Sequence, residues 1–528
     1  MDRREFLAHS AATGGALFLP GSLHAETEEA QAPATSTADP PQIRVLMVEA
    51  NGAPLEKARA ATLCARDMAN DPLPQRIIRA EGRARIELPE EPIQMALRLE
   101  VPGFGEIYCW ADNDGRGYTK PGNIPFVIDA AATRLRRVRE AAALARREGL
   151  SLDRRTQSFV KAAEQPVTDV PSAYAALAAG LNAGERIALA SARRRIARFS
   201  QPRHDFLFGC LIAPYARLGA PFEEAVRKLF NFATASWYTW GQEQPVDQRI
   251  DYGRMDASID WCLERGINPK GFGYCYMIRG ATPEWIREWP YEKILPEYRR
   301  IVRQTMQRYS GKLGHAEIIN EAHDKSNLWK LTHPQVIEIT KAVCEAAREG
   351  SPTVKRLINS CCMWAEYAKN ANSDGARRWS PYRYIADCVS GGVEFETIGL
   401  QLYYPSIDLL EIERMLDRFT KFNKPIHITE IATASAPGLD LNSMRPKSIS
   451  PPWHGPWSEA RQADWLEAIY TLVYSKPQFE AITWWDLVDI PGHFWPHGGL
   501  LNADLTPKPA YHRLAKLQKS WGVARDSD

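Results

Sequence analysis

Two glutamates, Glu321 and Glu430, end short apolar runs and are the strongest candidates for chemistry in this sequence. Glu321 ends the run EIINE at 317–321, and Glu430 ends the run IHITE at 426–430. Cleavage of a glycosidic bond with retention of configuration needs two carboxyl groups about 5 Å apart. One must be protonated to donate to the leaving oxygen, and the other must be ionised to attack the anomeric carbon. Asn320, beside Glu321, can hydrogen-bond the sugar 2-hydroxyl in the transition state.

These runs belong to a series of short apolar stretches that are separated by longer amphipathic ones. The stretches lie at 206–212, 232–237, 271–278, 316–320, 357–363, 397–403, 426–429 and 481–485. Eight such strands alternating with helices predict a parallel (β/α)8 barrel over residues 204–520. Functional side chains in this fold lie at the C-terminal ends of the strands, where Glu321 and Glu430 follow strands four and seven. Either glutamate alone would be an ordinary surface residue, but the pair is far less expected by chance.

Several segments resemble glycoside hydrolase family 10, the endo-β-1,4-xylanases. Residues 318–321 (IINE) look like its acid/base motif, and residues 428–430 (ITE) look like its nucleophile motif. Further similar segments are 230–234, 399–403, 499–501 and 507–511. The resemblance covers roughly residues 204–520. It implies that Glu321 is the acid/base, that Glu430 is the nucleophile, and that no metal or organic cofactor takes part. It also implies a set of sugar-contacting residues, namely Asn320, Gln401, Tyr403, Trp485, Trp495 and Trp240.

The departures from the family's pattern fall at sugar-contact positions. On the second strand, Ala235, Ser236 and Thr239 replace the family's Glu, Asn and Lys; on the third, Lys270-Gly271-Phe272 replaces Arg-Gly-His; on the sixth, Tyr403 replaces His. Each lost polar contact to a substrate hydroxyl costs roughly 0.5–3 kcal/mol. The aromatic residues that could rebuild the pocket around another sugar are Trp237, Tyr238, Tyr274, Tyr276 and Tyr404.

Three functions are therefore compared. The leading prediction is retaining endo-type hydrolysis of β-1,4 bonds, with xylan as the main substrate. The second keeps this chemistry but acts on another β-linked glycan, as the replaced sugar contacts suggest. The third, of a different class, is a non-catalytic carbohydrate-binding protein, which the presence of both glutamates disfavours. The sequence does not decide between endo and exo action.

The N-terminal third predicts export and two accessory regions. Arg3-Arg4 followed by a short apolar run and small residues near Ala25 resembles a twin-arginine signal over residues 1–25. Residues 26–42, rich in Ala, Pro, Thr and Glu, are typical of a linker. Alternating apolar residues at 43–128 predict a small β-sandwich-like domain, which binds glycan or orients the barrel. Residues 129–203 predict connecting helices, chiefly at 131–148 and 173–198.

Bulk composition excludes several partners. The 528 residues carry a formal net charge of only +2, which argues against nucleic acid. The apolar run of the signal is too short to span a bilayer, and no other run is long enough. The nine cysteines show no paired metal-binding spacing, and buried free thiols are the expectation, with one or two disulfides possible. We expect a monomer that binds a polysaccharide or oligosaccharide.

Three further features of the C-terminal half could be taken as functional. Trp453 and Trp457, in a Pro/Gly-rich loop, suit a sugar-stacking platform and a loop anchor equally well. His493, His497, Asp486 and Asp489 make an unspecific metal-like set, and a structural role is the expectation. His427 alternates away from Glu430 and is interpreted as structural. The sequence has no Gly-rich phosphate loop and no Gly-x-Ser-x-Gly nucleophile elbow.

Overall fold

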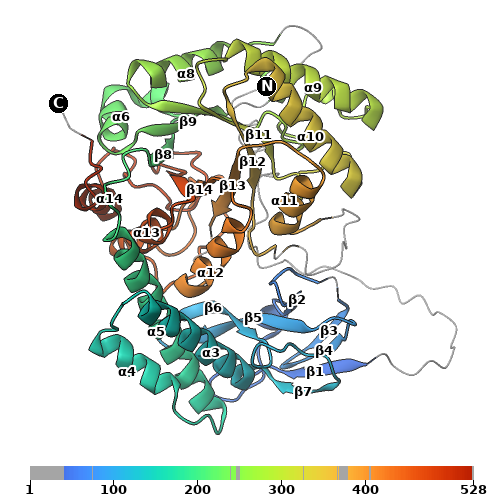
Figure 1. The fold of residues 1–528 in the computed structure, drawn as a ribbon, viewed down its shortest axis with the longest axis vertical. Helices are drawn as coiled ribbons and strands as arrows, with labels where there is room; N and C mark the ends of the chain where they lie inside the picture. Colours follow the sequence, from blue (N-terminus) through green and yellow to red (C-terminus); the bar gives the residue numbers. More distant parts are fainter. Residues whose placement is uncertain are drawn as a thin grey trace, which may run out of the picture.

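Eight parallel strands close into a barrel that forms the larger, C-terminal part of the molecule (Figure 1). The closed order is β10-β11-β12-β13-β14-β15-β8-β9, and this confirms the predicted (β/α)8 barrel. The strands are β8 Leu207–Leu211, β9 Phe232–Trp237, β10 Asn268–Phe272, β11 His315–Asn320, β12 Lys355–Ser360, β13 Thr397–Leu402, β14 Ile426–Ile431 and β15 Phe479–Trp484. Helices surround the barrel, because a parallel sheet is normally covered on both of its faces.

The structure, a computed structural model, describes residues 41–525 except 74, 238–239, 245–249, 325, 366, 368–377 and 404–405. The predicted export signal at 1–25 and all but the end of the predicted linker at 26–42 lie outside the described residues. The helices of the barrel are α6 Tyr215–Leu229, α7 Trp240–Glu243, α8 Gly253–Glu264, α9 Tyr291–Arg308, α10 His333–Gly350, α11 Pro381–Ser390, α12 Leu409–Thr420, α13 Glu459–Tyr474 and α14 Pro509–Ser520.

The third barrel strand differs from its predicted range of 271–278. Strand β10 ends at Phe272, because Gly273 adopts a φ of 65° and turns the chain. The apolar residues continue beyond this turn because the following segment is also buried. Cys275 forms an isolated parallel bridge with Ile319, so the segment covers the end of β11. The apolar run at 271–278 therefore identified buried residues correctly, but only its first two residues belong to a strand.

Among the described residues, the N-terminal region contains two small sheets and four helices. One sheet has the order β3-β4-β1-β7, and the other has the order β2-β5-β6. Their strands are β1 Gln42–Leu46, β2 Cys64–Asp67, β3 Ile77–Ala80, β4 Arg83–Glu87, β5 Ile93–Val101, β6 Gly105–Ala111 and β7 Gly122–Pro125. The longer helices are α3 Phe126–Arg147, α4 Arg154–Ala163 and α5 Val170–Ile196, which lie together beside the sheets in Figure 1. A short helix, α2, spans Lys57–Ala60.

Buried ion pairs join this region to the barrel. The guanidinium of Arg134, on α3, donates to both carboxylate oxygens of Asp408 at 3.0 and 2.5 Å. Arg137, one turn further along α3, contacts Glu411 on α12 at 3.0 Å and Asp112 after β6 at 3.1 Å. These contacts cross the junction between the two parts, so they fix the N-terminal region on α12.

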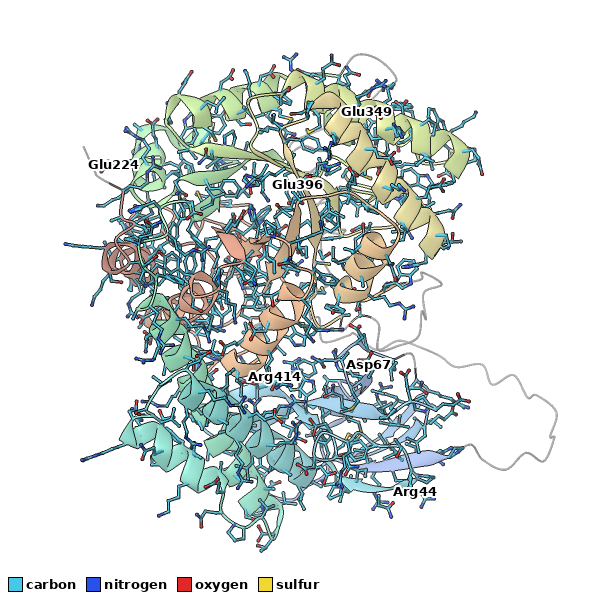
Figure 2. All side chains as sticks on the ribbon, viewed as in Figure 1. Arg44, Asp67, Glu224, Glu349, Glu396 and Arg414 are labelled. Atoms are coloured by element: carbon cyan, nitrogen blue, oxygen red, sulfur yellow. The ribbon has the colours of Figure 1, made fainter. Side chains whose placement is uncertain are left out.

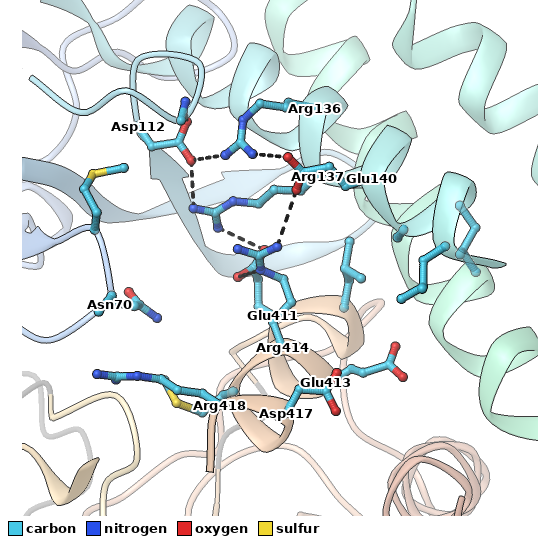
Figure 3. Close-up of a pocket in the computed structure, with 18 of the residues that line it drawn as sticks. Asn70, Asp112, Arg136, Arg137, Glu140, Glu411, Glu413, Arg414, Asp417 and Arg418 are labelled. Carbon is cyan, nitrogen blue, oxygen red and sulfur yellow. Dashed lines mark hydrogen bonds and ion pairs between the residues drawn. The ribbon is translucent and has the colours of Figure 1, made fainter. Parts of the chain in front are cut away.

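A cavity of about 640 Å³ lies at the same junction (Figure 3). Its lining carries many charges, but opposite charges pair with one another across it, as Arg136 does with Asp112. Figure 2 places Arg414 at this junction, whereas Glu224 and Glu349 lie on outer helices of the barrel. We interpret the cavity as part of a charged interface between the two regions.

Two predictions about the chain's covalent and membrane state can be compared with the structure. All nine cysteines lie in the described part of the chain, and all are buried free thiols, which confirms the default expectation for them. Among the helices that the structure describes, none combines the length and apolar character needed to cross a bilayer.

Candidate active site

Glu321 directly follows β11 and is held by three side chains. Its Oε1 accepts a hydrogen bond from Gln401 Nε2 at 2.7 Å. Its Oε2 accepts from Ser326 Oγ at 3.1 Å and from the Tyr276 hydroxyl at 3.2 Å. The residue itself has a φ of 53°, a left-handed conformation that is uncommon for a residue with a side chain. Such strain concentrates at functional sites, and here it accompanies a buried carboxyl group that is 6% exposed.

Glu430 occupies the C-terminal end of β14 and is 5% exposed. Its Oε2 accepts a hydrogen bond from the Tyr403 hydroxyl at 2.9 Å. The Tyr403 ring stacks on Trp495, with ring centres 5.0 Å apart and planes 14° from parallel. Gln401, which bonds Glu321, is the residue of β13 that pairs in register with Glu430. Gln401 therefore lies next to Glu430 in the sheet and bonds the carboxyl group of Glu321.

Burial raises the pKa of both carboxyl groups. Burial, together with the nearby charge of Asp324, raises the pKa of Glu321 to about 7. Burial also raises the pKa of Glu430 well above its usual range, and the charges of Glu317 and Glu321 add to the rise. Lys270 and the Tyr403 hydroxyl act in the opposite direction on Glu430. Since each carboxylate opposes ionisation of the other, the pair can hold one proton near neutral pH, as acid and nucleophile require.

A polar network lies beneath the carboxyl groups. The Asn359 amide, on β12, donates to Asn320 Oδ1 at 3.0 Å and accepts from Thr429 Oγ1 at 2.6 Å. It thereby links the residues that precede Glu321 and Glu430. The network needs Gly399, because a Cβ at that position would lie 2.6 Å from Asn359 Oδ1.

A buried ion pair lies deeper in the barrel. Lys270 Nζ is 3.0 Å from Glu317 Oε2, and both side chains are completely buried. Lys270 therefore occupies the third-strand position where the family has Arg, but its charge is directed to Glu317 inside the barrel. Phe272, two residues on, packs beside Trp485 with ring centres 5.6 Å apart.

Of the predicted site residues, the structure brings most together. Asn320, Gln401, Tyr403 and Trp495 bond or stack within the network around the two carboxyl groups, and Trp485 follows β15 with its amide bonded to Ile431. Trp240 lies apart from this network.

Trp240 belongs to the packing between helices. Its indole Nε1 donates to Gln244 at 2.9 Å, and its ring packs edge-on against Tyr298 of α9 at 5.0 Å. It is 2% exposed, and its contacts with Gln244, Trp285 and Tyr298 all lie outside the carboxylate network. The structure thus gives Trp240 a packing role among the described residues and no contact with the carboxyl groups.

The aromatic residues proposed to rebuild the pocket have different outcomes. Tyr276 contacts Glu321, as described above. Tyr274 is buried against Gly271, where a Cβ would lie 2.0 Å from the tyrosine hydroxyl. Tyr238, Tyr404 and the side chain of Trp237 lie outside the described residues.

Sequence reasoning missed three polar residues of this site. Ser326 and Asn359 belong to no recognisable motif. The loop after β11 brings Ser326 to the site, and the register of β12 brings Asn359 there. Arg445 comes from the long loop before α13, and its guanidinium lies 4.3 Å from the ring centre of Phe494 and 5.9 Å from that of Trp495. A loop cation of this kind has no periodic signal in the sequence, so only the structure could find it.

The two ambiguous tryptophans are loop anchors. Trp453 Nε1 donates to Glu185 of α5 at 3.1 Å, and Trp457 Nε1 donates to the Pro451 carbonyl at 2.8 Å. His493 Nε2 bonds Asp440 at 2.8 Å, and Asp486 accepts from the backbone of Phe494 and Trp495. The metal-like set therefore organises the loop that carries Trp495.

Comparison with known proteins agrees with this geometry. The sequence profile described as Glycosyl hydrolase family 10 matches residues 200–517. Similar curated proteins include the anti-sigma-I factor RsgI6 of Acetivibrio thermocellus, 23% identical over 60% of this chain and 38% of that protein. Another is a beta-1,4-xylanase of Dictyoglomus thermophilum, 22% identical over 56% of this chain and 84% of that protein. The chain thus spans well under half of the first relative's length and most of the second's.

One of the solved structures to which the chain is similar is a xylanase. Native xylanase 10B from Thermotoga maritima has 20% identity and a TM-score of 0.49, covering 60% of this chain and 97% of that one. The profile match extends over more than half of the sequence and contains both glutamates, all eight barrel strands and the network around the carboxyl groups. The chain therefore belongs to glycosyl hydrolase family 10.

Proposed function

We propose that this chain is a retaining endo-1,4-β-xylanase-like hydrolase, with Glu430 as nucleophile and Glu321 as acid/base. The observation that supports this most strongly is the pair of buried carboxyl groups at the C-terminal ends of β11 and β14. They interact electrostatically with each other, and Tyr403, Gln401 and Tyr276 orient them.

The residues suit a two-step displacement. Glu430 attacks the anomeric carbon while Glu321 gives its proton to the leaving oxygen, so a glycosyl–enzyme ester forms as the glycosidic bond breaks. Glu321, now ionised, takes a proton from water, and the resulting hydroxyl displaces Glu430 from the sugar. The hydrogen bond from Tyr403 favours the ionised form of Glu430 at the start and end of this cycle.

Xylan is the proposed substrate because relatives across the family profile carry xylanase names, as the Dictyoglomus protein does. A second candidate, another β-linked glycan, is favoured by one specific observation. Lys270 is paired with Glu317 inside the barrel, and Tyr403 bonds the nucleophile, so neither matches the polar contacts that the family's residues would offer.

Product analysis separates these candidates. Wild type and Glu430→Ala are incubated with xylan, mixed-linkage glucan, mannan and cellulose, and the products are separated by size. Short xylo-oligomers from wild type only would support the proposal, whereas selective cleavage of another glycan would transfer support to the second candidate. Sugar binding without any cleavage would contradict both and favour a carbohydrate-binding protein.

We further propose that the chain acts as a monomer exported through its twin-arginine-like N-terminus, and that the N-terminal sheets orient the barrel. The last proposal is supported by the buried Arg134–Asp408 contact between the two regions. Fractionation of cells that express the full chain tests the export, and light scattering tests the oligomeric state.

A further inference from the structure

Two buried histidines lie at the end of the barrel opposite the carboxyl groups. His315 is the first residue of β11, and His427 is the second residue of β14. Glu480 is the second residue of the neighbouring strand, β15. All three therefore lie at N-terminal strand ends, some four or five residues away from the C-terminal ends that carry Glu321 and Glu430. None of them is used by the proposed reaction.

The three side chains converge from different parts of the barrel wall. One ligand-type atom from each of them lies within 4.8 Å of the other two. The imidazole centres of His315 and His427 are 4.7 Å apart, and the ring of Phe232 packs edge-on against both. Because β11 and β14 are separated by two strands in the barrel order, the cluster connects opposite parts of the barrel.

Three of the four ring nitrogens of the histidines are buried and have no hydrogen-bond partner among the described residues. His427 is 1% exposed, and neither of its ring nitrogens has a hydrogen-bond partner among the described residues. His315 is 9% exposed, and its Nε2 also lacks a partner in the described part of the chain. The separation of 3.9 Å between His427 Nε2 and Glu480 Oε2 is too long for a hydrogen bond. Unpaired buried nitrogens are costly, so they need a partner of another kind.

A divalent cation meets this need. Two imidazoles and one carboxylate are a ligand set that zinc takes in proteins. Tetrahedral zinc with bonds of about 2.0–2.1 Å separates its ligand atoms by roughly 3.4 Å, so small side-chain rotations would close the site.

Two lysines lie near the cluster, and each has a carboxylate partner. Lys270 is paired with Glu317 at 3.0 Å. Lys355 Nζ lies 3.8 Å from Glu480 Oε2, but its side chain is 49% exposed and can turn into solvent. The Glu480 side chain is 32% exposed, which leaves a path by which an ion can enter.

We propose that His315, His427 and Glu480 form a binding site for a divalent transition-metal ion of the zinc type, which fastens β11 to β14 and β15 at the base of the barrel. Its position at the N-terminal strand ends makes it a stabilising site, since the catalytic face of this fold is the opposite one.

The test uses the untagged full chain, stripped with a chelator and titrated with ZnCl2. Isothermal titration gives the stoichiometry, thermal unfolding gives the change in Tm, and replacement of zinc by Co²⁺ gives visible absorption characteristic of nitrogen ligands. Two variants remove ligands, Glu480→Gln and His427→Gln. His512→Gln, at an exposed position on α14, is the matched control.

We expect one zinc per wild-type chain, a rise in Tm with zinc, and unchanged behaviour in the control. Each ligand variant should weaken binding by about tenfold or more. Because Glu480 is partly exposed, Glu480→Gln should fold even if His427→Gln does not. In that case the zinc affinity of Glu480→Gln alone tests the proposal. Absence of stoichiometric zinc binding, or equal binding by wild type and Glu480→Gln, would overturn the proposal. These readouts do not involve glycan hydrolysis, so the result is independent of the proposed function.

Discussion

The Tyr403 hydroxyl donates a hydrogen bond of 2.9 Å to Glu430 Oε2, while the ring of the same residue stacks on Trp495. At this position the family pattern has a histidine. The tyrosine therefore keeps a hydrogen-bond donor beside the nucleophile, although it changes the size and charge of the group. Its burial raises its own pKa well above the usual range, so it stays a donor throughout the working pH range.

Tyr403→Phe tests whether this contact assists the reaction. Removing a hydrogen bond to an ionised group costs about 1.5–3 kcal/mol, so kcat should fall about tenfold to a hundredfold. The stacking on Trp495 remains, so Tm should change little. Tyr384→Phe is the matched control, because Tyr384 is equally buried but its hydroxyl bonds Thr340, on an outer helix. Equal kcat values for Tyr403→Phe and wild type would contradict a role for the contact.

The pH dependence of activity should follow the protonation of Glu321. Because its pKa is raised to about 7, the acid is lost as pH rises, and kcat/KM should decline above about pH 7. Asp324→Asn removes a negative charge that raises this pKa, so the alkaline limb should move to lower pH. Asp464→Asn, at an exposed position on α13, should leave the profile unchanged. If the alkaline limb of the kcat/KM profile lies at the same pH in Asp324→Asn as in wild type, protonation of Glu321 does not determine that limb.

The same shift predicts a pH-dependent stability difference. A carboxyl group whose pKa is raised by folding contributes stability below its unfolded value of 4.5, and this is lost as pH rises through about 7. Glu321→Gln stays neutral, so its free energy of unfolding should exceed that of wild type by about 3 kcal/mol at pH 8 and by little at pH 4. Urea unfolding at both pH values measures this, and a constant difference would contradict it.

The Lys270–Glu317 pair should stabilise the barrel only as a pair. Lys270→Met leaves a buried carboxylate without its counter-ion and should lower the free energy of unfolding by about 3–5 kcal/mol. Adding Glu317→Gln removes that charge and should restore part of the loss. Denaturant unfolding of the two single variants and the double variant measures the coupling. Strictly additive losses would contradict a direct interaction.

Gly399→Ala should disturb the carboxylates through Asn359. The new Cβ would lie 2.6 Å from Asn359 Oδ1 and 2.5 Å from Leu357 Cδ2, closer than such atoms can approach. We expect a fall in kcat as well as a lower Tm, because Asn359 connects Asn320 with Thr429. Gly314→Ala is the control, since nothing lies within 4 Å of its added Cβ. Identical activity of the two variants would rule out a positioning role for the network.

Sequence periodicity predicted the barrel because short stretches rich in apolar residues alternate with longer amphipathic ones. The strand β11 is one of them, and its six residues are all buried. It placed Glu321 and Glu430 correctly at strand ends because the carboxyl ends of parallel strands gather at one face. It failed at β10, where burial continued after the strand ended at Gly273. The family resemblance, not periodicity, placed Trp240 among the sugar contacts, and in the structure its indole packs against α9. Contacts such as Asn359 with Thr429 depend on register across strands, which no single run can reveal.

The most direct test of the account is the identity of the nucleophile. The enzyme is incubated with a 2-deoxy-2-fluoro xylobioside that carries a good leaving group, digested, and its peptides are analysed by mass spectrometry. The account predicts one glycosyl ester, on the peptide that contains Glu430, and none in Glu430→Ala. An adduct on another residue, or glycan hydrolysis that persists in Glu430→Ala, would contradict the assignment of Glu430 as the nucleophile.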